Sequence, residues 1–514
     1  MKKTIVYCLF MLCPYLLSAQ TYELNFDARV VKSFGVLKKG SSVHIKSMTH
    51  DVKFDETSGS IMITGSGNVK VIDSYTLNTD QGDVTVKEKL EKVLDVNYRD
   101  AQNFWDVQII YNVLEQLSKK GTQVELRAEM EEDALEYINR VQSYGLAFDD
   151  PYLESYIYGV ISKLAPSILI DGRPGNVNLL IQRNPIANAM MFPNGTLVIT
   201  TGLISLLHSE DELAAILSHE IAHFVLDHSV QNYNKMVSRA KRAEFWAGLA
   251  TILTAATEVA VAANNSYYTP GITTAAVAAA SSQIATEVCK RLGMVYNRKQ
   301  ESEADDMAIE LLKIMKYDPN ALSTALSRIE ETLKQERSHE MYFASDHPAL
   351  NIRIAKAGIP SKIVDKNFEK IISFAVSDAA TMKMQDRRFR QAMPLVSQNI
   401  NNNVATADDY IQKANCLLYL RNDESTHSEV TSLINEAKKL APNNINIHKT
   451  EILALLRQKN YGGAKSLLAT YKERLLKMRS SDNNRPEDIW SIAYKFATSE
   501  LVWADDMSMK LRSF

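Results

Sequence analysis

Two histidines and a glutamate at positions 219–223 have the types and spacing of a zinc-binding helix. His219 and His223 are four residues apart, so on a helix both imidazoles project from one face, one turn apart. Such a pair can bind one Zn²⁺, and Glu220 between them can reach a metal-bound water as a general base. The alternative is a buried helix with two incidental histidines, which predicts no third ligand elsewhere in the chain.

The residues around this motif predict a regular helix. Ser209 and Glu212 have the spacing of a capping box, with Ser209 at the N-cap. Apolar residues then follow at helical intervals, namely Leu213, Ile216, Leu217, Ile221 and Phe224. The two histidines are therefore expected inside a packed helix, which is what a metal site needs to hold its ligands in place.

A second predicted helix supplies a candidate third ligand. Glu301 and Asp305 open a helical run and share one of its faces. A catalytic zinc takes three protein ligands and keeps one position for water, so Glu301 would complete a His₂Glu site with one Zn²⁺ per chain. Asp305 could accept the Nδ1–H of a ligand histidine and fix its tautomer. Alone, these acids could simply complement the helix dipole, but beside the histidine motif the metal site is the favoured interpretation.

With these residues in place, the stretch from about Asp149 to Lys356 resembles the gluzincin family of zinc metallopeptidases. That family contains the CAAX prenyl proteases, the HtpX heat-shock membrane proteases and the mitochondrial inner-membrane stress protease. Further segments match the family in order and spacing: residues 188–195, 197–199 and 201–203, His228, His347-Pro348 and Arg353-Ile354. Two departures lie outside the ligand set and could alter substrate fit: Asp346 replaces the usual threonine, and Met190-Met191 replaces the more frequent Phe-Ala.

The resemblance implies a metalloendopeptidase in which His219, His223 and Glu301 bind the zinc. The ion would lower the pKa of its bound water to about 7 and polarise the scissile carbonyl. Glu220 would take the proton of that water and later give it to the leaving amine.

The resemblance also implies roles for residues outside the ligand set. Asn188 and Ala189 would lie on a strand whose edge pairs with an extended substrate. His347 is either a loop histidine or a site residue, which would stabilise the oxyanion or occupy the open zinc position as a latch. Arg353 could hold a carboxylate structurally, and His228 is expected to have a structural role near a helix C-terminus.

The composition is that of an ordinary globular protein. Its 514 residues allow two to four domains, with 46% hydrophobic and 23% charged residues. The net charge is −3, and no basic patch with interleaved aromatic residues is present. A nucleic-acid partner is therefore not expected.

The first 20 residues have the pattern of a secretory signal peptide. Two lysines precede an apolar run over residues 5–17 and a small-residue cleavage site. That run is too short for a typical membrane span, so a periplasmic location in a Gram-negative bacterium is expected. Cleavage would remove two of the four cysteines and leave Cys289 and Cys416, which are expected as buried thiols.

The remaining chain is predicted as α+β, mainly α, in three parts. Residues 21–148 begin with a small β-rich unit and continue as helices, and residues 149–357 form the HExxH zincin-type metallopeptidase domain. Residues 358–514 are predicted helical, as about two degenerate tetratricopeptide-like (TPR-like) units or as a plain bundle. Residues 245–284 are expected to form an alanine-rich hairpin over the active-site cleft, with a peripheral membrane contact as the lesser alternative.

Two hypotheses for the function follow. The first is a zinc endopeptidase that cleaves misfolded or stalled envelope proteins, because a secreted HtpX-like domain followed by such helices resembles the periplasmic BepA-like branch. That branch handles outer-membrane assembly and protein quality control, so the C-terminal helices would bind outer-membrane assembly proteins. The second is a latched or non-proteolytic periplasmic chaperone or binding module that uses the same helices. An integral membrane CAAX-type protease is disfavoured by the cleavable signal and the lack of further long apolar spans.

Overall fold

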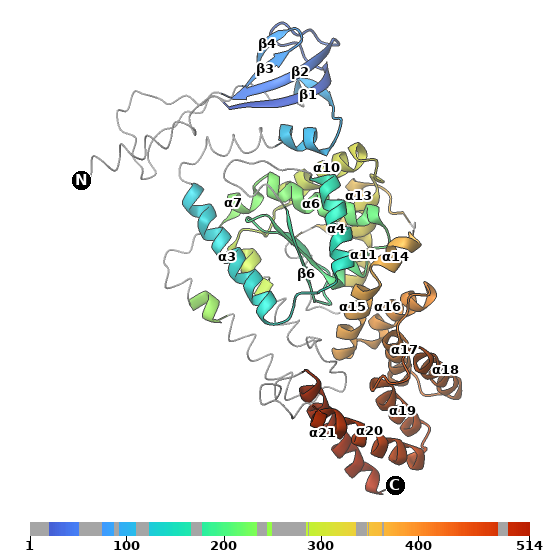
Figure 1. Cartoon of the computed structure of the whole chain (residues 1–514). Helices are drawn as coiled ribbons and strands as arrows, with labels where there is room; N and C mark the ends of the chain where they lie inside the picture. The colour runs from blue at the N-terminus through green and yellow to red at the C-terminus, as the bar shows by residue number, and fades with distance from the viewer. Residues whose placement is uncertain are drawn as a thin grey trace, which may run out of the picture.

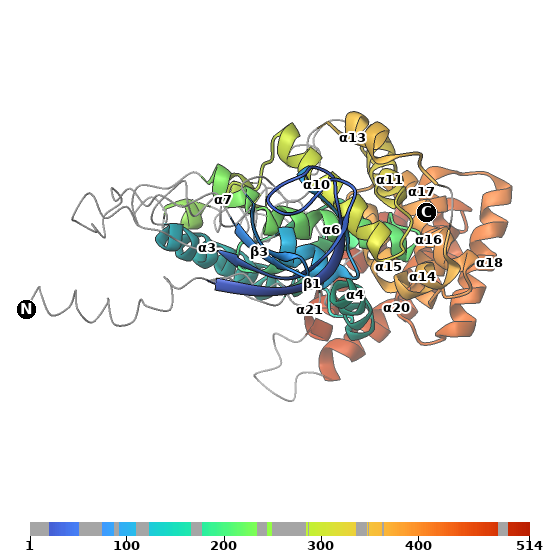
Figure 2. The same ribbon diagram turned by 90° about the horizontal axis from the view of Figure 1, so that it is seen from above.

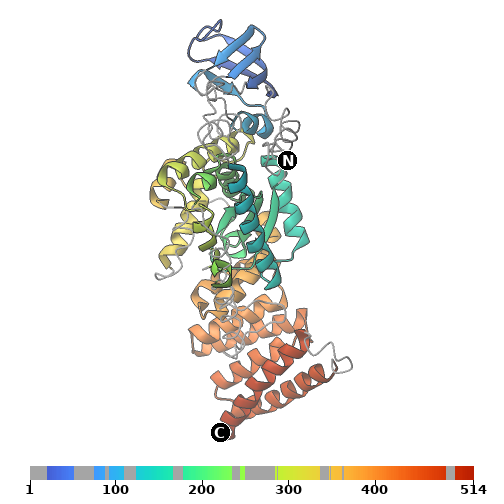
Figure 3. The same ribbon diagram turned by 90° about the vertical axis from the view of Figure 1, so that its left-hand side faces the viewer.

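The chain is arranged as an N-terminal sheet, a middle part of helices around a second sheet, and a C-terminal series of helices (Figure 1). The side view places the N-terminal sheet and the C-terminal helices at opposite ends of an elongated molecule (Figure 3). The computed structural model describes residues 20–50, 75–86, 92–108, 123–165, 177–233, 244–248, 284–285, 287–335, 347, 349–361, 364–481 and 492–513.

Two predicted segments fall outside these residues. They are the signal peptide, apart from its last residue, and most of the hairpin, whose positions 249–283 are not described. Among the helices that are described, none combines the length and the apolar character that a membrane crossing requires.

The N-terminal part is a five-stranded antiparallel sheet in the order β4-β3-β2-β1-β5. Alternate residues of β1, from Leu24 to Val30, are buried on one face and form a core of their own. Seen from above, this sheet lies over the middle part of the molecule (Figure 2). Its strands are β1 (Gln20–Val30), β2 (Ser42–His50), β3 (Tyr75–Thr79), β4 (Gly82–Val86) and β5 (Leu94–Asn97). This confirms the predicted β-rich unit.

The middle part contains a three-stranded sheet made of β6 (Asn178–Gln182), β7 (Ala189–Met191) and β8 (Thr196–Thr200). Its order is β6-β8-β7, with β6 parallel and β7 antiparallel to β8. Every residue of β7 and β8 is buried, which requires cover on both faces.

Alternate residues of this sheet belong to two different cores. Ala189 and Met191 pack with helices α4 (Pro151–Leu164) and α6 (Glu210–Val225) on one face. Met190 and Val198 pack with α3 (Gln123–Ser143) and residues 284–296 on the other. Helix α3 precedes residue 149 in the sequence, yet it covers one face of the metallopeptidase sheet.

The remaining helices of the middle part surround α6. Helix α6 begins at the predicted N-cap, where the Ser209 side chain accepts a hydrogen bond from the Glu212 backbone N–H. The second half of the predicted capping box is absent, because the Glu212 carboxylate pairs with Arg328 instead. The other helices are α5 (Thr201–Ile204), α7 (His228–Asn232), α10 (Arg298–Ile314), α11 (Ala321–Gln335) and α13 (Leu350–Ala357).

The C-terminal part is helical, as predicted. Consecutive helices pack against each other, α15 on α16, α17 on α18 and α19 on α20, which is compatible with the predicted TPR-like pairs and with a plain bundle. Its helices are α14 (Lys366–Ile371), α15 (Ser373–Gln385), α16 (Phe389–Asn401), α17 (Ala407–Leu420), α18 (Glu424–Leu440), α19 (Asn446–Arg457), α20 (Tyr461–Ser481) and α21 (Ile492–Lys510). The fold class is therefore the predicted one, mainly α with two small sheets.

The first C-terminal helices share the core of the middle part. Ala375, Ala379 and Val396 belong to the same apolar cluster as the sheet and α6. At this junction the buried Asp378 carboxylate accepts hydrogen bonds from Arg183 Nη2 at 2.6 Å and from the Thr201 hydroxyl at 3.1 Å. The C-terminal helices are thus joined to the loop that follows β6.

Replacing Asp378 is expected to destabilise this junction. Asp378→Ala leaves the largely buried Arg183 guanidinium without its carboxylate, a loss of about 3 kcal/mol for a buried pair. For a chain of 514 residues, thermal unfolding should show a midpoint lowered by about 3 °C. The matched control is Asp505→Ala, which breaks an exposed pair with Lys472 and should shift the midpoint by about 1 °C or less. Equal shifts for the two variants would contradict the importance of this contact.

Candidate metal centre

Helix α6 carries three of the predicted site residues into the interior of the middle part. His219, Glu220 and His223 are each 1% exposed. Every residue of α6 from Glu212 to Val225 is buried, so the helix is held on all sides. The two imidazole Nε2 atoms face each other at 3.1 Å.

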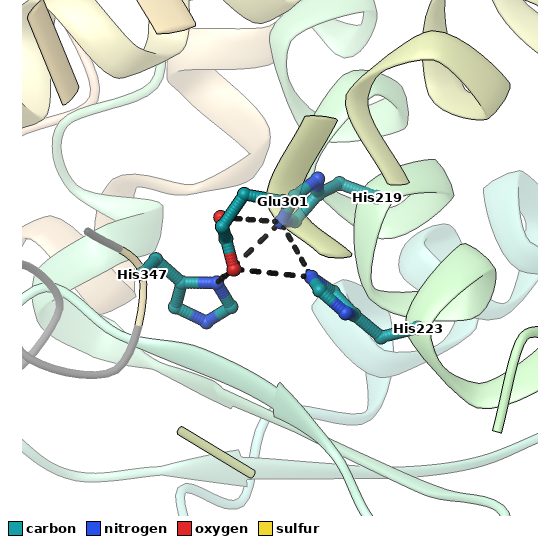
Figure 4. A group of neighbouring side chains, drawn as sticks. All are labelled: His219, His223, Glu301 and His347. Carbon is teal, nitrogen blue, oxygen red and sulfur yellow. Dashed lines mark hydrogen bonds and ion pairs between the residues drawn. The ribbon is translucent and has the colours of Figure 1, made fainter. Parts of the chain in front are cut away.

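Helix α10 packs against α6 and brings the predicted third ligand to the histidines (Figure 4). A full capping box between Asn297 and Gln300 begins α10 directly before Glu301. The Glu301 carboxylate lies 3.4 Å from His223 Nε2 and 3.6 Å from His219 Nε2. The structure therefore brings together all three predicted metal ligands.

His347 joins the same group from the segment before α13. Its side chain is buried, and its Nδ1 lies 3.1 Å from Glu301 Oε1 and 3.5 Å from His219 Nε2. One ligand atom from each of the four residues lies within 4.8 Å of the other three. Pro348, its partner in the sequence motif, lies outside the described residues.

The donor set fits a zinc ion. Two nitrogens that each bind a tetrahedral zinc at about 2.0–2.1 Å lie about 3.3 Å apart, close to the separation of the two Nε2 atoms here. Both carboxylate oxygens of Glu220 are buried and lack a hydrogen-bond partner among the described residues. Such a group is costly to bury unless water or substrate pairs with it in the working site.

A carboxylate behind His219 fixes the orientation of its ring. Asp305 Oδ1 lies 3.0 Å from His219 Nδ1, which leaves Nε2 directed at the metal position. Arg353 donates to Asp305 from Nε at 2.9 Å and from Nη2 at 2.7 Å, and its Nη1 lies 2.5 Å from Glu301 Oε2. Burial alone would raise the pKa of Asp305, but the contacts with His219 and Arg353 hold it well below its usual range.

His223 is oriented by a contact that sequence analysis missed. Its Nδ1 lies 2.8 Å from His228 Nδ1, and His228 Nε2 lies 3.4 Å from Glu303. The ring of Tyr296 stacks on His223 at a centroid distance of 3.7 Å. Burial lowers the pKa of His223 well below its usual range, which favours the neutral imidazole that binds metal.

The spacing of His228 gives no helical indication of this contact, because residues five apart do not share a helix face. The contact arises where α6 ends and Asp227 adopts a left-handed conformation with φ of 61°, which redirects the chain into α7. His228 was expected to be structural, and its position is that of a residue that orients a metal ligand.

Charge around Glu220 is set by the neighbouring site residues. Burial raises the pKa of Glu220, although electrostatic interactions with the nearby His347 and His219 oppose this effect. His347 Nε2 lies 3.7 Å from Glu220 Oε1. Burial alone would lower the pKa of His347, but the Glu301 and Glu220 carboxylates raise it to about 9.

The predicted substrate strand is β7, at the edge of the sheet beside α6. Asn188 and Ala189 are buried at its start, and Asn188 Oδ1 has no hydrogen-bond partner within the described part of the chain. Met190 and Met191 are both core residues, on opposite faces of the sheet. This departure from the family pattern therefore lies in the packing on both faces of the strand.

Both cysteines outside the predicted signal peptide are buried thiols, as expected. Cys289 lies in the core beside α3, with its Sγ 3.7 Å from Met190 Sδ, and Cys416 lies in α17. Burial raises the pKa of the Cys416 thiol to about 12, so this thiol stays protonated at neutral pH.

Comparisons with known proteins support this assignment. The chain is 27% identical over 180 residues to "Mitochondrial metalloendopeptidase OMA1" of Schizosaccharomyces pombe, covering 35% of this chain and 44% of the relative. It is 27% identical over 197 residues to "Putative beta-barrel assembly-enhancing protease" of Vibrio cholerae, covering 38% and 36%. It is 25% identical over 180 residues to "Metalloprotease LoiP" of Escherichia coli, covering 35% and 60%.

The chain thus spans less than half the length of the first two of these relatives. The matched stretch of this chain is the one that carries the site. Peptidase family M48 matches residues 151–358, a range that includes His219, Glu220, His223, Glu301 and His347. The predicted resemblance is confirmed: over residues 151–358 the chain is similar to peptidase family M48, a family of metallopeptidases.

Proposed function

We propose that this protein is a zinc-dependent endopeptidase of the bacterial envelope that cleaves misfolded or stalled proteins. One observation carries the proposal: the Nε2 atoms of His219 and His223 converge with the Glu301 carboxylate beside the buried Glu220. Two imidazoles and one carboxylate are a ligand set of catalytic zinc sites in peptidases.

The three ligands would hold one zinc ion, which when bound supplies Lewis-acid chemistry that activates a water and polarises the scissile carbonyl. Asp305 keeps the Nδ1 side of His219 occupied, so that Nε2 is free to bind. Arg353 balances the negative charge of Asp305 and Glu301 in the buried site.

Glu220 is the proposed general base. Its carboxylate is buried beside the ligands with neither oxygen hydrogen-bonded within the described chain, so both can accept a proton from water. Its raised pKa favours the later donation of that proton to the leaving amine. An extended substrate would pair with the edge of β7 at Asn188 and Ala189.

The proposed setting is protein quality control and outer-membrane assembly in the periplasm. Two observations support it: the amino-terminal pattern of a secretory signal peptide, and the similarity to a putative beta-barrel assembly-enhancing protease. In this proposal the TPR-like C-terminal helices bind outer-membrane assembly proteins.

A second candidate function is a latched or non-proteolytic chaperone. Its support is the position of His347, whose ring nitrogens lie within reach of both Glu301 and Glu220. If His347 bound the metal as a fourth protein ligand, a tetrahedral site would keep no position for water. In the endopeptidase, His347 instead stabilises the oxyanion by donating a hydrogen bond.

The general-base role predicts that Glu220→Gln abolishes casein cleavage and retains zinc. The amide keeps the size of the side chain and cannot accept a proton, so the rate should fall by a factor of about 10³ or more. Cleavage is measured by fluorescence release from labelled casein, and zinc by elemental analysis of the same samples. Cleavage that survives the substitution would refute the role of Glu220. No cleavage by either protein, with zinc in both, would favour the latched form, and His347→Ala should then release activity.

The metal assignment predicts that removing a ligand lowers zinc affinity more than removing a residue that only orients a ligand ring. Glu301→Ala should remove stoichiometric zinc, and His228→Ala should weaken zinc affinity by about 10- to 100-fold because the His223 ring loses its support. Affinity is measured by competition with a chromophoric chelator. The control is His427→Ala, which removes a partly exposed histidine of α18 and should leave affinity unchanged. Full zinc retention in Glu301→Ala would show that Glu301 is not a ligand.

A further inference from the structure

Three acidic residues near the start of α10 follow each other at two-residue intervals. Glu301 is a candidate metal ligand, and Asp305 lies behind one of the ligand histidines. Glu303 stands between them on a different face of the helix and is not one of the four candidate ligands. Its side chain is 40% exposed, and its Oε2 lies 3.4 Å from Nε2 of the buried His228. Glu303 therefore faces the residue that orients His223.

The contact between His223 and His228 restricts where their ring protons lie. The two Nδ1 atoms are 2.8 Å apart, so one ring must donate through an N–H and the other must accept through a lone pair. When Nε2 of a neutral His223 binds a metal, the single ring proton lies on Nδ1. His223 is then the donor in this contact, and His228 is the acceptor.

The same reasoning places the proton of His228. A neutral His228 that accepts at Nδ1 carries its proton on Nε2, which is the atom that faces Glu303. A carboxylate accepts this N–H, and a small rotation of the partly exposed Glu303 side chain can shorten 3.4 Å to hydrogen-bond distance. A proton on Nδ1 of His228 would instead point at the Nδ1–H of His223. Hydrogen bonds therefore run in one direction through a relay of His223, His228 and Glu303.

With this relay, both ligand histidines are oriented by a carboxylate of α10. His219 meets Asp305 directly, at 3.0 Å, whereas His223 meets Glu303 through one intervening ring. A carboxylate that accepts from a ligand histidine fixes its tautomer and raises its basicity toward the metal. The helix that supplies the third candidate ligand thus also orients the other two.

We propose that Glu303 is a positioning residue of the metal centre, which acts on His223 through His228. The inference rests on the proposed zinc endopeptidase function and adds the residue that holds the second ligand histidine in its metal-binding tautomer. Lys299 Nζ lies 3.5 Å from Glu303 Oε1, so the other oxygen, Oε2, serves His228. The pair with Lys299 is a surface ion pair and contributes little by itself.

The first test is the zinc affinity of the full chain, measured by competition with a chromophoric chelator. Glu303→Leu should raise the Kd for zinc about fivefold, less than the about 10- to 100-fold of a residue that contacts the ligand directly. Glu303→Gln should raise it about twofold, because the amide oxygen still accepts a hydrogen bond. Two controls should leave the Kd unchanged: Lys299→Ala, which removes the other partner of Glu303, and Glu310→Leu, which removes a partly exposed carboxylate further along α10.

A comparison in two backgrounds separates the relay from a general effect of negative charge. In the His228→Ala background the path from Glu303 to His223 is absent, so Glu303→Leu should change the Kd no further. A carboxylate that acted on the zinc only through its charge would have the same effect in both backgrounds. That result would overturn the proposal, as would an unchanged Kd for Glu303→Leu alone.

The second test reads the ring protons by NMR of zinc-loaded protein that carries nitrogen-15 histidine. Two-bond proton–nitrogen correlations should show His228 protonated at Nε2, with its signals identified by their loss in His228→Ala. Glu303→Leu should shift this ring toward a mixture of tautomers and leave His219, which Asp305 holds, unchanged. A purely structural role of Glu303 would not move the tautomer, and a His228 protonated at Nδ1 in the parent would overturn the proposal.

Neither measurement depends on catalysis. If no substrate is cleaved while zinc is bound, the endopeptidase proposal fails, and the Kd and NMR comparisons still decide the role of Glu303. If cleavage is normal and Glu303→Leu changes neither the Kd nor the tautomer, the relay fails and the endopeptidase stands. A parent that binds no zinc would overturn both.

Discussion

The packing of α6 against α10 is the contact on which the metal centre depends. It brings two histidines and two acidic residues, Glu301 and Asp305, into one buried place. Ionised groups lose several kcal/mol each on leaving water unless they are paired. Arg353 from α13 meets this constraint by contacting both carboxylates at once. The candidate metal centre therefore needs α13 as well as α6 and α10.

The three-stranded sheet beside this helix pair must be covered by helices on both faces. Because its residues are buried on both faces, three strands need helices on each side. Helix α3 supplies the cover on the face away from α6, where Tyr137 of α3 donates a hydrogen bond to Gln182 of β6 at 2.9 Å. A segment outside the range that matches the family therefore supports the strand proposed to receive substrate.

The C-terminal helices extend the same core away from the metal. Asp378 binds Arg183 and Thr201, which lie at the two ends of the segment that contains β7 and β8. The junction is thus connected through the backbone to the candidate substrate strand.

Local patterns in the chain were enough to predict the two helices of the candidate metal centre. The spacing of His219 and His223, and of Glu301 and Asp305, follows from the periodicity of one helix, so each pair could be placed on a shared face without any tertiary contact. The alternating pattern between residues 21 and 80 likewise predicted the N-terminal β-rich unit. Only the folded chain could show that His228 supports His223, that Arg353 joins Asp305 to Glu301, and that α3 covers the sheet. These contacts depend on a left-handed turn at Asp227 and on packing between segments far apart in sequence, and neither leaves a periodic pattern in the residues.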